Sequence, residues 1–425
     1  LPRSRRRRET AGHLGDGRLE GAAWSDYAVD ATIGGQTFQV IVDTGSSTFA
    51  VAAAPGEGCW EYYSGPCLQK HIAAYYGSGN WTGDVCSGPE VTLAGLSAGS
   101  PLFAGIKTQD NFLTDCSRQS SGIVSEGIVG MAYQELIEGF DGVPLFDSVV
   151  STSGIPNIFS MQCCGWKGGA AAGGQLVLGG VDSSLYTGEF QWTPITRHLW
   201  FCVELVDAYV EGHVAPPPAP EPECPATFPA VQCFYYSCGN AGATCEDGLC
   251  KCPSGTCFTV TEGFLGETWQ CVPPVEEPFA RLQQLGALRA SRADEALNEG
   301  SKPPGCNAII DSGTSEIVFT SEHYRKVMHA LTEVAEQVVG DAECVVESML
   351  GSFPDVTIVL GGGVKLSVPP TTYFQPRGDG SGCYIHFIGS GSSPSIIGQP
   401  LMEAYYTVFD KANDRIGFAP IAGCD

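Results

Sequence analysis

The 425-residue chain carries a formal net charge of −25 and contains 55 glycines and 28 prolines. Such a negative charge disfavours nucleic acids and anionic membranes as partners. It fits either an acidic compartment that neutralises carboxylates or a need for solubility alone. Dense Gly and Pro punctuation favours an all-β fold, and the length allows two or more domains.

The cysteine content indicates the cellular environment. Nineteen cysteines predict disulfides, and hence the secretory pathway, with an extracellular or acidic endomembrane destination. The glycosylation sequon Asn80-Trp81-Thr82 agrees with this prediction. No run of about 18 apolar residues predicts a membrane span. Because the sequence begins at Leu1 without an apolar signal region, we interpret it as a processed form or fragment, and a membrane anchor beyond Asp425 is compatible with it.

Residues 1–24 precede the first predicted strand and contain the basic run Arg5-Arg6-Arg7-Arg8. Such a run is compatible with a nucleic-acid patch, a solvated tail or a processing site. In front of a secreted protein we favour a processing site, so that residues 1–24 are the remnant of a pro-segment or a disordered terminus.

Short β-branched segments between Gly-rich turns predict strands in the first half of the chain. The clearest are Tyr27 to Ile33, Thr37 to Val42, Glu90 to Leu93 and Gln175 to Leu178. One short helix is expected from Leu145 to Ser151. In the second half, apolar residues at helical spacing predict a packing helix from Ser321 to Val339.

One five-residue motif occurs twice. Asp43 opens D-T-G-S-S and Asp311 opens D-S-G-T-S, each directly after a short apolar run. A hydrophobic-hydrophobic-Gly signal follows at the same offset, since Gly130 lies 130 − 43 = 87 residues after the first aspartate and Gly398 lies 398 − 311 = 87 residues after the second. A single copy would be an ordinary turn. Two copies with matching offsets predict an internal duplication with one aspartate in each half.

The duplication has a chemical consequence. Two carboxylates in one dry cleft cannot both ionise easily, so they share a proton. The ionised member can activate water, and the protonated member can donate to a peptide carbonyl without a covalent intermediate. Asp43 and Asp311 are therefore the predicted catalytic dyad for amide hydrolysis, with no metal and no cofactor.

A cysteine-rich segment separates the two halves. Residues 215–220 form a stiff Pro-rich linker, and eight cysteines follow between Cys224 and Cys271. So many cysteines with so few apolar residues predict a disulfide-stapled module, and Cys250-Lys251-Cys252 faintly resembles an EGF-like repeat. A zinc site is the alternative, but the segment contains no CxxC pair. A helical linker is expected from Ala280 to Leu297.

Several further motifs carry the resemblance of the whole chain to a known family. They are Phe49-Ala50-Val51 after the first motif, Gly179-Gly180-Val181-Asp182, the segment Met402 to Asp410, and Arg415-Ile416-Gly417-Phe418-Ala419. The chain resembles the pepsin-like aspartic proteases, and within them the beta-secretase (memapsin) branch, over about residues 25–213 and 305–424. Ala50 stands where typical pepsins carry Trp.

The resemblance implies a bilobal all-β fold with two lobes related by a pseudo-two-fold axis. The lobes would be residues 25–195 and 196–425, with the cysteine-rich segment 215–304 inserted in the second. It also implies an acidic-pH endopeptidase acting on a peptide or protein substrate. The insertion lies where the family has a short hairpin, so we expect it to bind a protein partner rather than to take part in catalysis.

The resemblance further implies roles for the residues around the dyad. Gly45 and Gly313 would allow the tight turns, and Ser46 and Thr314 would bond the outer carboxylate oxygens. Thr44 and Ser312 would exchange hydroxyl bonds between the two loops. Tyr76 would be the flap tyrosine that closes over substrate, and Trp81 would donate to its phenol. The adjacent Tyr75 is the alternative register for the flap tyrosine.

The resemblance also implies two disulfides, Cys344–Cys383 and Cys164–Cys424. Two local bridges, Cys59–Cys67 and Cys86–Cys116, are plausible from proximity in sequence. This leaves Cys163, Cys202 and Cys306, and pairing of Cys306 into the insertion is one open alternative. Because the total is odd, at least one thiol must be free or intermolecular.

Three other functions are weaker interpretations. Gly95-Leu96-Ser97-Ala98-Gly99 fits the serine-hydrolase motif, but Ser100-Pro101 follows it where a helix is required. The seven histidines contain no H-E-x-x-H, which argues against a metallopeptidase. A non-catalytic binding protein of the same fold would usually have lost an Asp or Gly of the dyad motifs, and both are intact.

Overall fold

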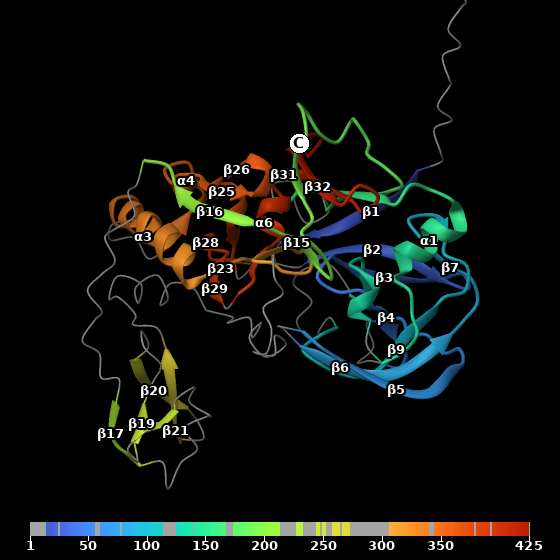
Figure 1. The fold of residues 1–425 in the computed structure, drawn as a ribbon, viewed down its shortest axis with the longest axis horizontal. Coiled ribbons are helices and arrows are strands. Elements are labelled where there is room, and N and C mark those ends of the chain that lie inside the picture. The colour runs from blue at the N-terminus through green and yellow to red at the C-terminus, as the bar shows by residue number, and fades with distance from the viewer. Residues whose placement is uncertain are drawn as a thin grey trace, which may run out of the picture. The chain divides into compact units, whose positions relative to one another are not determined.

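The structure is a computed structural model of the chain (Figure 1). It describes residues 14–23, 26–55, 60–76, 79–113, 125–137, 139–166, 173–212, 306–339, 344–377, 380–391 and 393–424, and the backbone of five strands between 227 and 272. The chain divides into two compact units, residues 1–213 with 290–425, and residues 214–289. Predictions for Arg5 to Arg8 and for the Pro-rich and helical linkers fall outside the described residues.

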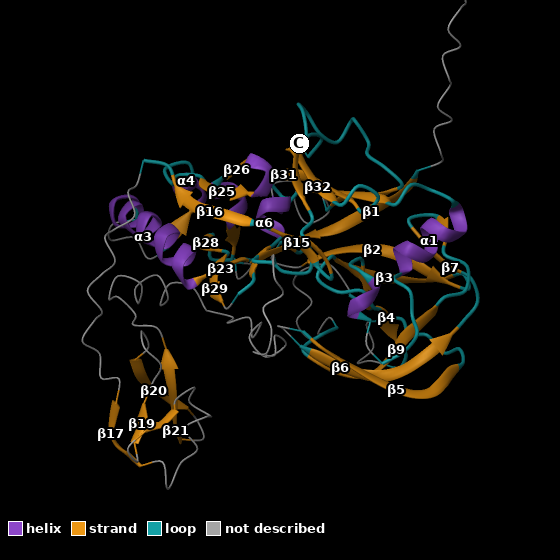
Figure 2. Cartoon of the chain, in the orientation of Figure 1, coloured by secondary structure: helices purple, strands orange, loops and turns teal. Residues whose placement is uncertain are grey.

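Strands dominate the first unit, as the colouring of Figure 2 shows, and the all-β prediction is confirmed. The largest sheet has 15 strands, because the amino-terminal strand β1 joins β2 on one side and β12 on the other. Since β1 spans Gly15–Ala22, this part of residues 1–24 is an ordered strand rather than a disordered terminus. Its strands are β1 (Gly15–Ala22), β2 (Asp26–Ile33), β3 (Gln36–Asp43), β4 (Phe49–Ala52), β5 (Cys67–Tyr75), β6 (Asn80–Ser87), β7 (Val91–Leu93), β8 (Leu96–Ser97), β9 (Leu102–Asp110), β10 (Gly127–Gly130), β11 (Ile158–Cys163), β12 (Gly174–Leu178), β13 (Gln191–Pro194), β31 (Tyr405–Asp410) and β32 (Arg415–Pro420).

Three smaller sheets complete this unit. One has six strands in the order β14-β15-β22-β30-β23-β29, and the other two have three strands each. The six strands are β14 (Arg197–His198), β15 (Phe201–Val203), β22 (Ala308–Ile310), β23 (Ile317–Thr320), β29 (Ile388–Gly391) and β30 (Ser395–Ile397). The others are β16 (Leu205–Val210), β25 (Val356–Leu360) and β26 (Val364–Val368), and β24 (Val345–Val346), β27 (Phe374–Pro376) and β28 (Cys383–His386).

The internal duplication appears in the strand pairing. In the first half, β3 lies parallel to β10, β10 lies antiparallel to β4, and β4 lies parallel to β9. In the second half, β22, β30, β23 and β29 repeat the same three pairings in the same order. Strands β4, β10 and β22 are buried along their whole length, as expected for central strands covered on both faces. In each half the first strand of this series, β3 or β22, leads into the D-[TS]-G motif.

Few helices accompany these sheets. The predicted helices are confirmed as α1 (Leu145–Ser153), which Gly154 ends with φ 68°, and α3 (Ser321–Val338). Helix α3 buries Val327, Leu331 and Ala335 at helical spacing and packs against β16 and β23. The short helices are α4 (Glu347–Leu350), α5 (Pro370–Tyr373) and α6 (Gln399–Met402), with 3-10 turns η2 (Gln134–Leu136) and η5 (Gly361–Gly363). No helix in the described part of the chain is long and apolar enough to cross a membrane.

The second unit contains a three-stranded sheet in the order β17-β19-β18 and a separate hairpin β20–β21. The hairpin pairs antiparallel from Cys257 with Val272 to Gly263 with Gly266. The strands are β17 (Thr227–Gln232), β18 (Thr244–Glu246), β19 (Leu249–Lys251), β20 (Cys257–Gly263) and β21 (Gly266–Val272).

Candidate active site

The two motif loops cross-link each other through their second residues. The amide of Thr44 donates to Ser312 Oγ over 3.0 Å, and the amide of Ser312 donates to Thr44 Oγ1 over 2.8 Å. Each hydroxyl then donates to the strand that leads into the opposite loop, Thr44 to the Ile310 carbonyl at 2.9 Å and Ser312 to the Val42 carbonyl at 2.6 Å. Both residues are fully buried. These four bonds hold the two loops in fixed register.

This crossing brings the two aspartates together. A Cβ on Gly45 would lie 2.6 Å from Asp311 Oδ2, and a Cβ on Gly313 would overlap the carboxylate of Asp43. Only glycine leaves room for each loop to approach the carboxylate of the other. The sequence prediction that Gly45 and Gly313 permit a close approach therefore has a direct geometric counterpart.

Each carboxylate accepts the same two hydrogen bonds from its own loop. The Gly45 amide donates to Asp43 Oδ1 and the Gly313 amide to Asp311 Oδ1, both over 2.8 Å. Ser46 Oγ donates to Asp43 Oδ2. In the second loop the matching donor is Thr314 Oγ1, at 2.6 Å from Asp311 Oδ2. Both oxygens of each carboxylate are thus held by donors from its own loop.

The environment disfavours charge on the pair. Burial raises the pKa of Asp43 well above its usual range, and the neighbouring Asp311 carboxylate raises it further. The donors Ser46 and Gly45 act in the opposite direction without cancelling this effect. The pair consequently retains one proton at a pH where an isolated aspartate would have lost it.

A β-hairpin places an aromatic side chain near the dyad. Strands β5 and β6 pair antiparallel, from Cys67 with Cys86 to Tyr75 with Asn80. Next to the turn, the Tyr76 amide donates to the Gly79 carbonyl over 2.8 Å. Tyr76 packs against a buried cluster and stacks on Phe112 with ring centroids 4.9 Å apart. Burial raises the pKa of its phenol, and Asp43 adds to the rise. Tyr75 is 73% exposed, so Tyr76 is the inward-facing tyrosine of this hairpin.

Trp81 lies beside Tyr76. The indole is 1% exposed, and its Nε1 meets no acceptor in hydrogen-bond geometry among the described residues. It still lies near enough to favour the ionised phenol and so partly offsets the rise in the Tyr76 pKa. The effect on the phenol pKa supports the predicted Trp81–Tyr76 hydrogen bond and the position of Nε1 does not, so this hydrogen bond stays a prediction.

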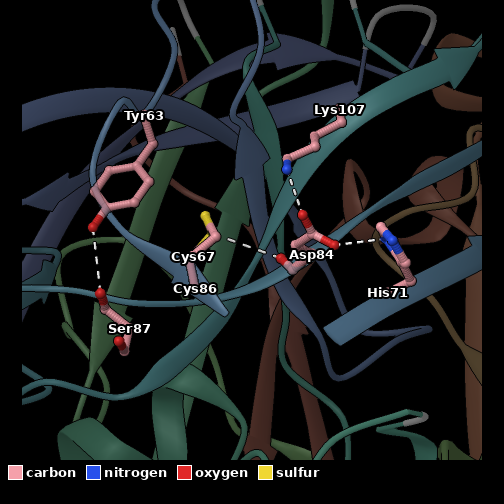
Figure 3. Close-up of a disulfide and its surroundings, with 7 residues drawn as sticks. All are labelled: Tyr63, Cys67, His71, Asp84, Cys86, Ser87 and Lys107. Atoms are coloured by element: carbon pink, nitrogen blue, oxygen red, sulfur yellow. Dashed lines mark hydrogen bonds and ion pairs between the residues drawn. A yellow bond between two sulfur atoms is a disulfide. The ribbon is translucent and has the colours of Figure 1, made fainter. Parts of the chain in front are cut away.

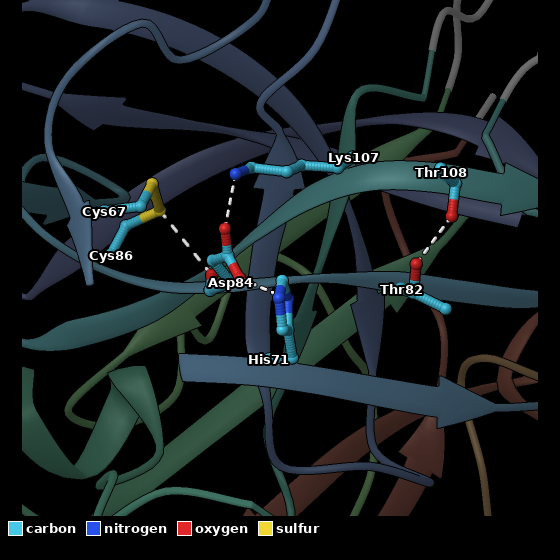
Figure 4. Close-up of polar contacts among 7 residues, drawn as sticks. All are labelled: Cys67, His71, Thr82, Asp84, Cys86, Lys107 and Thr108. Atoms are coloured by element: carbon cyan, nitrogen blue, oxygen red, sulfur yellow. Dashed lines mark hydrogen bonds and ion pairs between the residues drawn. A yellow bond between two sulfur atoms is a disulfide. The ribbon is translucent and has the colours of Figure 1, made fainter. Parts of the chain in front are cut away.

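The outer face of the hairpin carries an ion-pair cluster. Asp84 of β6 accepts from Lys107 of β9, and its other oxygen lies 2.7 Å from Nδ1 of His71 on β5 (Figure 4). The hydrogen bond from Lys107 is the main reason that the pKa of Asp84 is lowered. His71 is 90% exposed, so its contact with Asp84 contributes little to stability. The cluster joins three strands of the hairpin sheet.

The disulfides confirm two predictions and correct three. Cys164–Cys424 and Cys344–Cys383 are formed as the resemblance implied. Both predicted local bridges are wrong, because Cys67 pairs with Cys86 across the hairpin with Cα atoms 3.8 Å apart (Figure 3). The expectation that Cys306 pairs into the insertion is also wrong, since Cys306 is bonded to Cys202 of β15. Cys163 is a buried free thiol.

Sequence reasoning missed two polar residues next to the dyad. Asp26 at the start of β2 accepts from Ser315 Oγ at 3.3 Å and from Gln399 Nε2 at 3.2 Å. Gln399 directly follows Gly398 of the second hydrophobic-hydrophobic-Gly signal, so its position next to a motif was a usable indication. Asp26 gave no such indication, because it lies 17 residues before the first motif in sequence (43 − 26 = 17).

The rival chemistries find no geometric support in the described part of the chain. Ser97 donates to the exposed Glu90 carboxylate rather than facing a histidine. No cluster of three or more His, Cys, Asp or Glu side chains able to hold a metal occurs among the described residues.

Comparison with known proteins identifies the family to which the chain belongs. The family model described as "Eukaryotic aspartyl protease" matches residues 26–226 and 288–421. The chain is 25% identical over 404 residues to pepsin-2B of Gadus morhua, covering 91% of this chain and 93% of that protein. It is 25% identical to gastricsin of Oryctolagus cuniculus and 24% identical to cathepsin E of Aquarana catesbeiana, covering 91% of this chain in both cases and 79% and 76% of the relatives. The chain belongs to the eukaryotic aspartyl proteases, a pepsin-like family of aspartic endopeptidases.

Proposed function

We propose that the protein cleaves peptide bonds with a water molecule activated by Asp43 and Asp311, beneath a flap that carries Tyr76, at acidic pH. The observation that carries this proposal is the mutual approach of the two motif loops. Gly45 lies against the Asp311 carboxylate, and the raised pKa of Asp43 keeps one proton on the pair. One ionised and one protonated carboxyl are what general acid–base attack of water on an amide requires.

Each supporting residue has a role in this mechanism. Ser46 and Thr314 hold the outer carboxylate oxygens, which leaves the inner oxygens to face the reacting water. Thr44 and Ser312 fix the separation of the two loops. Tyr76 closes over the substrate, excludes water and orders the peptide above the dyad. Gly313 and Gly45 keep side chains out of the space between the carboxylates.

Digestion of a peptide library over a series of pH values, read by mass spectrometry, tests the proposal. We expect a bell-shaped dependence of kcat/KM on pH with an acidic optimum, because one dyad carboxyl must be ionised and the other protonated. A transition-state analogue bearing a hydroxyl group should block cleavage. A flat profile from weakly acidic to alkaline pH would instead point to a serine or metal mechanism.

The flap role predicts different effects for two adjacent tyrosines. Tyr76→Ala should lower kcat/KM by about tenfold or more, equivalent to about 1.4 kcal/mol of transition-state stabilisation, because the inward ring no longer closes over substrate. Tyr75→Ala is the matched control and should leave kcat/KM nearly unchanged, since this ring faces solvent. Steady-state kinetics on a short peptide measures both. Equal effects of the two substitutions would show that the flap register is wrong.

We place the protein nearest the beta-secretase branch of the family and in the secretory pathway, extracellular or in an acidic endomembrane compartment. Support for the branch comes from Ala50 on the buried strand β4, where typical pepsins carry Trp. Support for the compartment comes from four disulfides among the described residues, which form and persist in oxidising environments.

The proposed division into lobes, 25–195 and 196–425, treats residues 215–304 as an accessory module that binds a protein partner. The Cys202–Cys306 disulfide joins the segments before and after the insertion, and its Cα atoms are 5.1 Å apart. Both cysteines belong to this body, so removal of the insertion leaves Cys306 bonded.

Replacing residues 215–304 with a short Gly/Ser hairpin should therefore retain hydrolysis of short peptides within about twofold. Each halving of a connection changes the loop-closure free energy by only about 0.6 kcal/mol. Kinetics on a short peptide, with circular dichroism as the folding control, measures this outcome. A folded variant without peptidase activity would mean that the insertion helps to build the cleft.

A further inference from the structure

A third carboxyl group lies close to the dyad. Asp26 is the first residue of β2 and adopts φ 63°, a left-handed conformation that Asp and Asn tolerate better than most residues. The residue is half-buried. Its Oδ1 accepts hydrogen bonds from Ser315 Oγ and Gln399 Nε2.

Both donors belong to the structure that carries Asp311. Ser315 is the last residue of the second motif. Gln399 Nε2 also donates to the Ser312 carbonyl at 2.7 Å. The backbone amide of Gln399 donates to the Thr314 carbonyl at 2.9 Å. A carboxyl from the first half of the chain is thereby tied to the catalytic loop of the second half.

Asp311 is the charged group that acts on Asp26 from these surroundings. Burial raises the pKa of Asp26 to about 6, Gln399 and Ser315 lower it in part, and the Asp311 carboxylate adds a smaller rise. Of the other carboxyls on the neighbouring elements, Glu316 directly follows Ser315 and has a pKa that burial raises, and two others are hydrogen-bonded elsewhere. Glu20 of β1 accepts from Gln39, and Glu403, which follows α6, accepts from Tyr27.

We propose that Asp26 is a positioning residue of the peptidase reaction, whose negative charge keeps the last proton on the Asp43–Asp311 pair as the pH rises. The argument rests on the proposed dyad. Electrostatic coupling is reciprocal, so a carboxylate that the dyad charge disfavours must in turn disfavour a second negative charge on the dyad. Above about pH 6 Asp26 is mostly ionised, and its charge then acts on a pair that already holds its last proton more tightly because burial raises the pKa of Asp43. Asp26 thus extends the active, singly ionised form of the dyad toward higher pH.

Asp26→Asn tests this proposal. Asn tolerates the same backbone conformation and can accept from Ser315 and Gln399, so only the charge is removed. We expect the alkaline limb of the pH profile to move to lower pH by about half a pH unit or more, because the charge that disfavours the doubly ionised dyad is removed. A residue with a purely structural role would not move this limb.

Glu403→Gln is the matched control. This carboxyl is buried, and its pKa is also raised to about 6, but its hydrogen-bond partners are Tyr27, Ala23 and Gln375 rather than the dyad loops. Its alkaline limb should coincide with that of the wild type. If the wild type cleaves peptides and the Asp26→Asn profile superimposes on it, the proposal for Asp26 is wrong while the dyad assignment stands. Absence of cleavage by the wild type would overturn the proposed function instead.

Discussion

Replacing either Asp43 or Asp311 with Asn should lower kcat/KM for peptide hydrolysis by about 10³-fold or more while the protein stays folded. Asn keeps the shape of the side chain and can accept the amide hydrogen bonds of Gly45 or Gly313. It cannot ionise, so the pair loses either its base or its acid. Stability should be unchanged or higher, because each variant removes a buried group whose charge is costly.

The double variant sharpens this test. The two carboxyls act as one unit, so Asp43→Asn with Asp311→Asn should be no less active than the poorer single variant. Asp414→Asn is the control, because this carboxylate is exposed, pairs with His198 and has φ 51°, which Asn tolerates. Wild-type turnover by either dyad variant would contradict the assignment of the dyad.

The duplicated architecture was predictable because its signals are local. A buried β-branched run followed by D-[TS]-G requires a strand and then a tight turn, and the same signals recur after an equal interval with a closing Gly. The parallel pairing of Asp43 with Gly130 in β3 and β10, and of β22 with β30, follows from that repeat. Secondary-structure patterns read over a few residues were sufficient for this part of the fold.

Disulfide pairing was less predictable, because spatial neighbours need not be sequence neighbours. The register that pairs Tyr75 with Asn80 places Cys67 opposite Cys86 only after a bulge between Cys67 and His71. Extending the hairpin back from its turn would have indicated this bridge, whereas proximity in sequence indicated the wrong partners. The Cys202–Cys306 bridge depends on pairing between β15 and β22, which no local pattern reveals.

Buried carboxyls outside the dyad could not be predicted from the sequence for a related reason. Asp26 lies in no motif, the motif from Met402 to Asp410 predicted no role for Glu403, and each carboxyl obtains hydrogen-bond partners from segments distant in sequence. Burial without a cation determines their chemistry, and burial of a single polar residue is a property of the assembled fold. Sequence patterns therefore predicted the dyad but not the buried carboxyls outside it.

Glu403 gives the second large prediction, which concerns stability. Its Oε1 accepts from the Ala23 amide at 2.8 Å and from the Tyr27 hydroxyl at 2.7 Å, and its Oε2 accepts from Gln375 Nε2 at 2.8 Å. No cation accompanies it among these contacts, and the neighbouring Cys163 thiol is neutral because burial raises its pKa well above the usual range. Burial raises the pKa of Glu403 to about 6, and the three donors offset only part of that rise.

The direction of the pH dependence follows from this shift. The folded protein binds the Glu403 proton more tightly than the unfolded chain, whose carboxyl titrates near 4.5. Between about pH 4.5 and pH 6 the folded state therefore holds more protons, and the free energy of unfolding falls by roughly 2 kcal/mol as the pH rises. This contribution is fully present below about pH 4.5 and is lost above about pH 6, which favours the protein in acid.

Glu403→Gln should remove this part of the pH dependence, because the Gln amide stays neutral while its oxygen still accepts from Ala23 and Tyr27. Urea unfolding from about pH 4 to about pH 7, in an Asp43→Asn background that prevents self-digestion, measures the difference between the two curves. Relative to its parent, the variant should gain roughly 2 kcal/mol in the free energy of unfolding across this range, whatever constant offset the substitution introduces.

Glu211→Gln is the control, at an exposed site paired with Lys365, and its curve should run parallel to the parent curve. Parallel curves for Glu403→Gln as well would mean that Glu403 ionises at its ordinary pKa and that the buried carboxyl does not bias the protein toward acid.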